Sequence, residues 1–262
     1  MIRVPRAFRA PRAVAVASAL VVAAASAHAQ PWLRPDTASR TTQSYFRAIP
    51  EWGAPNEYRD AQGNPGPKYW QQRVDYTIRT RLDTLQHRVL GTARVTYHNN
   101  APASLGYLWF QLDQNIERDD SRAALADPAI AQVELPEQAR RFLFPDRSGL
   151  GNTIARVQLV DARGRLTDAR HLVNGTLMRV DLPTPLATGA SVQVEIEWSH
   201  GVPEAGTQNF NGRGERERVK DGWLYEMAQW FPRAAVYDDV TGWNTDQFLG
   251  QGEFYLNFGD YD

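Results

Sequence analysis

Polar and apolar residues alternate along two neighbouring stretches of the chain, residues 74–82 and 89–97. A period of two is typical of a β-strand that buries one face and exposes the other. The apolar set begins with Val74 in the first stretch and includes Gly91 in the second. Because only a few residues separate the two stretches, the pattern predicts an antiparallel hairpin.

A second hairpin is predicted within residues 171–182. Asn174-Gly175 lies near its middle, and an Asn-Gly pair accepts the positive φ values of a type I′ turn. Pro183 and Pro185 follow directly. Because proline cannot donate a ladder hydrogen bond, we expect these two residues to end the pair of strands.

Three further stretches complete the strand pattern. Residues 105–112 are apolar on both faces, which is typical of a strand covered on both sides. Residues 154–160 and 192–198 predict two more strands, the second with one buried face. At least six strands with few helices predict an all-β fold, either an antiparallel β-sandwich or an open, barrel-like sheet.

Two segments break the alternation and are predicted to be long loops. Residues 113–151 form an insertion loop that contains one short helix, residues 122–126, with residues 119–121 as its cap. Residues 201–222 are rich in glycine and in charges of both signs, which favours a mobile surface loop.

The first 29 residues have the three parts of a secretory signal peptide. Four arginines and no acid precede an apolar run, and Ala27-His28-Ala29 fits a small-x-small cleavage site. The run is shorter than the ~20 residues that a membrane-spanning helix needs, which disfavours the alternative of an uncleaved anchor. We therefore expect cleavage after Ala29, export to the periplasm or medium, and no membrane span in the mature chain.

The mature chain is expected to have two parts. Residues 30–68 are rich in proline and glycine and predict an extended arm, in which residues 60–64 form a turn and not a calcium loop. Residues 69–262 carry all the predicted strands and are expected to form the β-domain.

Charge and cysteine content exclude several classes of function. Of the 29 basic residues, four lie in the signal peptide, so the mature chain has 25 against 30 acidic residues and no basic face for nucleic acid. The chain has no cysteine, and therefore neither a disulfide nor a thiol nucleophile nor a thiolate metal site.

Aromatic residues interleaved with carboxylates are dense between residues 223 and 262. Such a stretch is typical of either a packed core or the wall of a ligand pocket. One hypothesis is therefore a stand-alone β-sandwich module that binds peptide or carbohydrate, with Trp223, Trp230 and Trp243 as a stacking surface.

Five short motifs follow one another in this stretch: Gln229-Trp230-Phe231-Pro232, Ala235-Val236-Tyr237-Asp238, Gly242-Trp243-Asn244, Gly252-Glu253-Phe254-Tyr255 and Phe258-Gly259-Asp260-Tyr261-Asp262. Their order resembles a run late in the N-terminal β-domain of the aminopeptidase N-like zinc metallopeptidases, the gluzincin aminopeptidases. The resemblance implies a saddle-like β-domain over residues 69–262, incomplete at its C-terminal side, with an open sheet edge. It also implies a catalytic domain beyond this chain as its partner, with zinc and a peptide substrate.

The zinc motif of that family is absent from the sequence. A His-Glu-x-x-His spacing would place two imidazoles on one helix face beside a general base. None of the five histidines of the chain has this spacing. We therefore expect this chain to have no catalytic residue and no metal ligand, and to be inactive alone.

The resemblance implies one pair of substrate-binding residues. In the family a glutamine of this domain contacts the free amino end of the substrate, and Gln229 matches that position. Phe231 stands where relatives often have a carboxylate or an amide, so Glu226 is the candidate for that second role. The alternative is that Gln229 only satisfies the backbone of its own loop.

Overall fold

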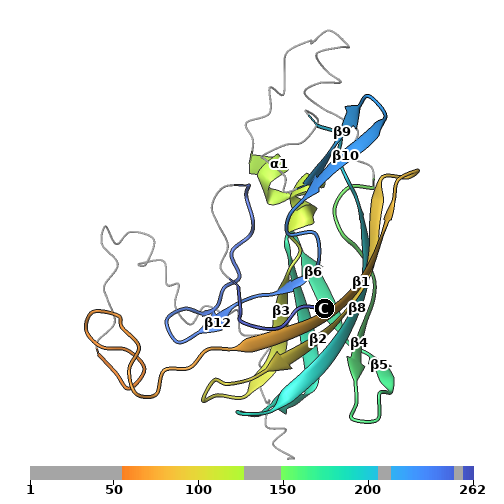
Figure 1. Cartoon of the computed structure of the whole chain (residues 1–262). Helices are drawn as coiled ribbons and strands as arrows, with labels where there is room; N and C mark the ends of the chain where they lie inside the picture. The colour runs from red at the N-terminus through yellow and green to blue at the C-terminus, as the bar shows by residue number, and fades with distance from the viewer. Residues whose placement is uncertain (1–54, 127–148, 206–213, 251–255) are drawn as a thin grey trace, which may run out of the picture.

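The computed structural model describes residues 55–126, 149–205, 214–250 and 256–262 (Figure 1). The predicted signal peptide, residues 30–54 of the predicted arm and the motif at residues 252–255 lie outside these ranges. The long strands are β1 (Arg73–Asp83), β2 (Arg88–His98), β3 (Leu105–Gln111), β4 (Thr153–Val160), β7 (Leu177–Leu186) and β8 (Ser191–Gly201). The shorter elements are η3 (Asp113–Glu117), α1 (Arg122–Ala126), β5 (Leu166–Asp168), β6 (His171–Asn174), β9 (Gly214–Val219), β10 (Gly222–Met227), β11 (Arg233–Ala234), β12 (Tyr237–Asp238) and β13 (Gly242–Trp243).

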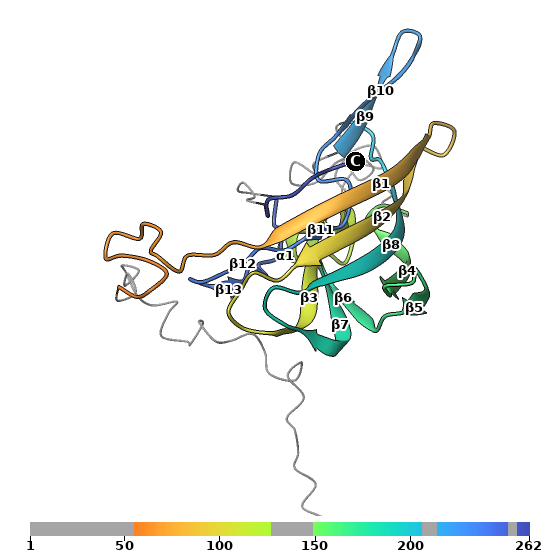
Figure 2. The same ribbon diagram turned by 60° about the horizontal axis from the view of Figure 1, so that its bottom comes forward.

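Two antiparallel sheets make up most of the fold. The larger has the strand order β1-β2-β8-β4-β5, and the smaller has the order β11-β3-β7-β6. Figure 2 shows β1, β2, β8 and β4 side by side, with the smaller sheet behind them. The hairpins β9–β10 and β12–β13 form separate two-stranded sheets. The predicted all-β, antiparallel, sandwich-like fold is confirmed.

The core lies between the two sheets. Alternate residues of each strand turn inward, as the period of two predicted, and form one apolar cluster. The members from the larger sheet include Val74, Tyr76, Ala93, Val95, Tyr97, Val157, Val194, Ile196 and Trp198, and those from the smaller sheet include Leu108, Phe110, Met178, Val180 and Ala234.

Residues 258–262, here called the tail, run parallel to β1 and bond to its edge. The amides of Val74, Tyr76 and Ile78 donate to the carbonyl oxygens of Phe258, Asp260 and Asp262 at 2.7–2.8 Å. These contacts cover part of the outer edge of β1, which is the first strand of the larger sheet. They need a close approach of the two backbones, because a Cβ at Gly259 would lie 1.7 Å from the Val74 oxygen.

Asp75 holds this tail through its charge. Burial alone would raise the pKa of Asp75, but hydrogen bonds from the Asp260 amide, Arg73 and His98 outweigh it and lower the pKa to about 2. Asp75 is therefore ionised at neutral pH, and its carboxylate accepts from the Asp260 amide at 2.9 Å. Arg73 adds a second link, since it also pairs with Asp260 at 2.7 Å.

Two details of the second predicted hairpin are wrong. The two-residue loop is Gly175-Thr176, because Asn174 pairs with Leu177, and only Gly175 has a positive φ, as in a type II′ turn. The prolines at 183 and 185 do not end β7, which continues to Leu186. They are tolerated because the pairing of β7 with β3 is irregular at this end.

The predicted loops are also more ordered than expected. Residues 214–227 form the β9–β10 hairpin, which projects beyond the two main sheets (Figure 1). In the insertion, α1 forms at the predicted residues, and the Ala124 amide donates to the Ser121 hydroxyl at 3.1 Å. The sequence did not predict η3, all five residues of which are buried.

The described part of the arm, residues 55–68, consists of turns and contains no long strand or helix. Asp60 accepts hydrogen bonds from the amides of Gln62 and Asn64, which confirms the predicted turn. Arg59 attaches the arm to the β-domain through an ion pair with Asp239 at 2.7 Å. No helix in the described ranges is long and apolar enough to cross a membrane.

Gly91 is a core position with no room for a side chain. It lies opposite Trp198 on the neighbouring strand, and a Cβ at residue 91 would stand 2.5 Å from Cζ2 of that indole. We predict that Gly91→Ala lowers the free energy of unfolding by about 1–3 kcal/mol, because the ring must move within a packed core. Urea unfolding measures this loss.

Gly106→Ala is the matched control, since this strand glycine has no atom within 4 Å of the position of the added Cβ. Its free energy of unfolding should stay within about 0.5 kcal/mol of the parent value. Equal effects of the two substitutions would show that contact with Trp198 is not the cause.

Candidate functional site

The loop between β10 and β11 contains Gln229, the substrate-binding candidate. Gln229 has a φ of +46°, and His87 is the other described non-glycine residue with a positive φ. A left-handed conformation costs a residue with a side chain of order 1 kcal/mol or more, so the surrounding contacts must impose it. A strained residue of this kind is a marker of a functional site.

The carbonyl groups on both sides of Gln229 are fixed by buried donors. Nε2 of Gln114 donates to the Ala228 oxygen at 2.9 Å, and Nε1 of Trp198 donates to the Trp230 oxygen at 3.3 Å. Nε2 of His200 lies 3.1 Å from the Trp230 oxygen as well. Burial lowers the pKa of His200, which favours its neutral ring at pH 7.

A buried ion pair fixes the end of the loop. The guanidinium of Arg233 donates to Asp113, with Nε 3.0 Å from Oδ2, and both side chains are at most 4% exposed. Next to it, the Ala234 amide donates to the hydroxyl of Tyr76 at 2.9 Å. Burial raises the pKa of Tyr76, so its hydroxyl remains protonated.

The side-chain oxygen of Gln229 is buried and accepts no hydrogen bond within the described ranges. A buried acceptor without a donor costs about 1–3 kcal/mol and is rare in folded proteins. Among the described residues, this oxygen therefore accepts no bond from its own loop. Backbone strain and an unpaired oxygen therefore coincide at one residue of this loop.

Glu226, the second substrate-binding candidate, lies three residues before Gln229. It is exposed on β10, directly opposite Glu215 on β9, whereas Gln229 follows the end of that strand. No hydrogen bond or ion pair connects the two candidates among the residues that the structure describes. The substrate-binding roles of Gln229 and Glu226 stay predictions.

The three tryptophans of the binding-module hypothesis lie in different environments. Trp243 is 7% exposed and packs in the core against Tyr97. Trp230 packs against Trp198, and Trp223 lies on the projecting hairpin, where its ring centroid is 4.6 Å from that of His87. Because Trp243 is buried, the three rings do not form one exposed stacking surface.

The described residues do not provide a zinc site. No group of three or more His, Asp or Glu side chains is placed to hold a metal ion in these ranges. The four described histidines lie apart and contact other groups: His87 contacts Tyr225, His98 contacts Asp75 and Ser191, His171 contacts the Ala169 carbonyl, and His200 contacts backbone carbonyls.

The residues that sequence reasoning missed are those that hold the loop. Asp113 and Gln114 belong to η3, which was predicted to be part of a loop, and Arg233 was not singled out. The only signal was the run of polar residues 113–115 directly after an apolar strand. Polar residues in that place are common in exposed turns, so the sequence did not indicate that these are buried.

The sequence matches no protein-family profile and no curated protein. Among solved structures, an M1 zinc metallopeptidase from Deinococcus radiodurans aligns at 13% identity and a TM-score of 0.31, over 75% of this chain and 31% of that chain. A mutant of an M1 zinc metallopeptidase from the same organism aligns at 10% identity and a TM-score of 0.30, over 67% of this chain and 42% of that chain. The chain thus spans about a third of the length of the first enzyme, and scores this low assign it to no family.

Removing one partner of the Asp113–Arg233 pair is predicted to be strongly destabilising. Arg233→Met leaves the Asp113 carboxylate buried without its cation, and we expect it to lower the free energy of unfolding by about 3–5 kcal/mol. Replacing both partners, Asp113→Leu with Arg233→Met, removes both charges and should recover most of that loss. Urea unfolding of the two variants and the parent tests this; a single variant as stable as the parent would contradict it.

Proposed function

We propose that this chain is a non-catalytic β-domain of an exported zinc aminopeptidase related to aminopeptidase N, and that Gln229 binds the free amino end of the peptide substrate. The observation that carries the proposal is the unpaired side-chain oxygen of Gln229, in a loop held in a strained conformation. It occurs at the residue that the motif resemblance indicated.

The chemistry of an amide oxygen suits this role. A peptide ammonium needs acceptors when it leaves water, and a neutral carbonyl oxygen supplies one without the desolvation cost of a second charge. The oxygen is buried in the present conformation, so the side chain must rotate to meet a ligand. Relief of the unpaired acceptor would then contribute to binding.

The remaining parts of the proposal concern the whole enzyme. Hydrolysis would belong to a catalytic domain, which would be the partner of this domain and would carry the zinc. The present chain would orient the substrate and perform no chemical step. The leader peptide, with cleavage after Ala29, supports a periplasmic or secreted location.

The test uses the dipeptide Ala-Ala and its N-acetylated form, titrated into the chain and followed by the backbone amide resonances of Ala228 and Trp230. We predict saturable shifts with the free amine and none with the acetylated peptide, which lacks the ammonium. Gln229→Ala should weaken binding about tenfold, because one hydrogen bond to a charged group is worth roughly 1.5 kcal/mol.

Gln62→Ala is the control, since it removes an exposed glutamine from the turn in the arm. It should bind the dipeptide as the parent does. Equal binding of both peptides, unchanged affinity in Gln229→Ala, or no saturable shift at all would each contradict the assignment of Gln229.

A further inference from the structure

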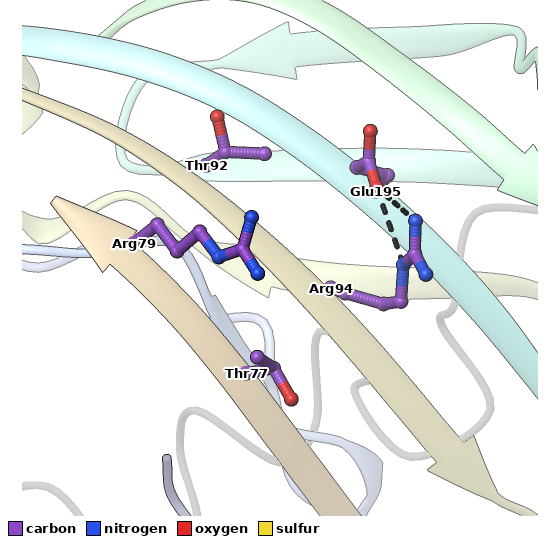
Figure 3. Close-up of a pocket in the computed structure, with 5 residues that line it drawn as sticks. All are labelled: Thr77, Arg79, Thr92, Arg94 and Glu195. Atoms are coloured by element: carbon purple, nitrogen blue, oxygen red, sulfur yellow. Dashed lines mark hydrogen bonds and ion pairs between the residues drawn. The ribbon is translucent and has the colours of Figure 1, made fainter.

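A cavity of about 350 Å³ lies on the outer face of the larger sheet. Figure 3 shows the five residues that line it, on three neighbouring strands: Thr77 and Arg79 of β1, Thr92 and Arg94 of β2, and Glu195 of β8. These residues alternate with the buried residues of the same strands, so they face away from the core. None of these five residues is among those that bond to the Gln229 loop.

Strand register arranges four of these residues in a square. Thr77 pairs with Arg94, and Arg79 pairs with Thr92, so the two arginines are diagonal neighbours. Long side chains on diagonal positions of a sheet are within reach of one another. Two guanidinium groups and two hydroxyl groups thus surround the same space.

Arg94 is already fixed in this square. Its Nε and Nη2 donate to Oε2 of Glu195 at 3.2 and 2.7 Å, the two contacts drawn in Figure 3. Nη1 of Arg94 makes no hydrogen bond to any residue in the described ranges. Because Glu195 restrains the guanidinium, a ligand that binds Nη1 meets a donor that has already lost much of its conformational freedom.

Arg79 has no partner among the described residues. No hydrogen bond or ion pair involves its side chain within the part of the chain that the structure describes, and the hydroxyls of Thr77 and Thr92 have none either. The guanidinium offers five N–H donors and no acceptor. The square therefore has many free donors, and its single carboxylate, Glu195, already binds Arg94.

The cavity continues along the strands. A second cavity of about 510 Å³ shares Arg79 and Thr92 with the first and extends to Arg81, Glu197 and Ser199. Glu197 is paired with Arg156 at 2.6 Å, so it does not cancel the charge of Arg79. The combined groove keeps a positive centre at Arg79, although the chain as a whole has a formal charge of −1.

We propose that this groove is a binding site for an oxyanion, a carboxylate or a phosphate group carried by a ligand that lies across β1 and β2. The forked donors of Arg79 match the two oxygens of such a group, and Nη1 of Arg94 and the hydroxyls of Thr77 and Thr92 supply further donors. A bound anion also offsets the repulsion between the two arginines. Both kinds of anion satisfy this geometry, and the experiment separates them.

The experiment titrates the full chain with inorganic phosphate and, separately, with acetate, at constant ionic strength set by sodium chloride. Backbone amide resonances report the site. We expect saturable shifts confined to residues 77–79 and 92–94, from the anion whose chemistry the site prefers. Saturation by phosphate alone assigns a phosphate ligand, and saturation by acetate alone or by both assigns a carboxylate-accepting site.

Three variants complete the test. Arg79→Gln should weaken binding at least fivefold. Arg79→Lys keeps the charge but loses the forked pair of N–H donors, so its affinity should lie between those of Arg79→Gln and the parent. Arg163→Gln removes an exposed arginine in the turn after β4 and should bind as the parent does. The proposal is overturned if the shifts are unsaturable, are spread over all surface arginines, or survive in Arg79→Gln.

Discussion

The rest of the structure depends on the hydrogen bonds of one buried polar turn. All five residues of η3 are buried, and a buried polar group without a partner destabilises a fold by about 1–3 kcal/mol. Asp113 accepts from Arg233, Gln114 donates to Ala228, and Asn115 donates to Gly175 at 2.7 Å and accepts from the Asn152 amide at 2.6 Å. Three segments distant in sequence thus meet at η3, because its polar groups are buried and bond to the chain instead of water.

This constraint explains why the Gln229 loop stays in an unfavourable conformation. Residues of η3 bond to Ala228 and Arg233, and Trp198 of β8 bonds to Trp230. The backbone between these three residues therefore has little freedom. The contacts that satisfy the loop carbonyls leave the side-chain oxygen of Gln229 unpaired. A site of this kind is stable only because the contacts around it are numerous and directional.

The sequence predicted the sheets well and the site poorly, for one physical reason. The alternation in β1, β2 and β8 is a repeated local signal, so the strands and the β1–β2 hairpin were confirmed. Arg233 and Asp113 are 120 residues apart, and the sequence around each gives no local pattern that predicts the ion pair. Gln229 was found through its motif, but its positive φ and its unpaired oxygen arise from contacts across the fold. The charge alternation of β9 was likewise taken for a loop, because strand pairing with β10 outweighs its polarity.

We infer that the Asp113–Arg233 pair positions the Gln229 loop, beyond any contribution to global stability. The most direct measurement is amide hydrogen exchange in the Asp113→Leu, Arg233→Met double variant, in which stability is largely restored but the directional contact is lost. We predict that the amides of Ala234 and Ala235 exchange about tenfold faster or more, while those of β2 and β8 keep their protection. Unchanged protection at Ala234 and Ala235 would contradict it, because the loop would then be held by packing alone.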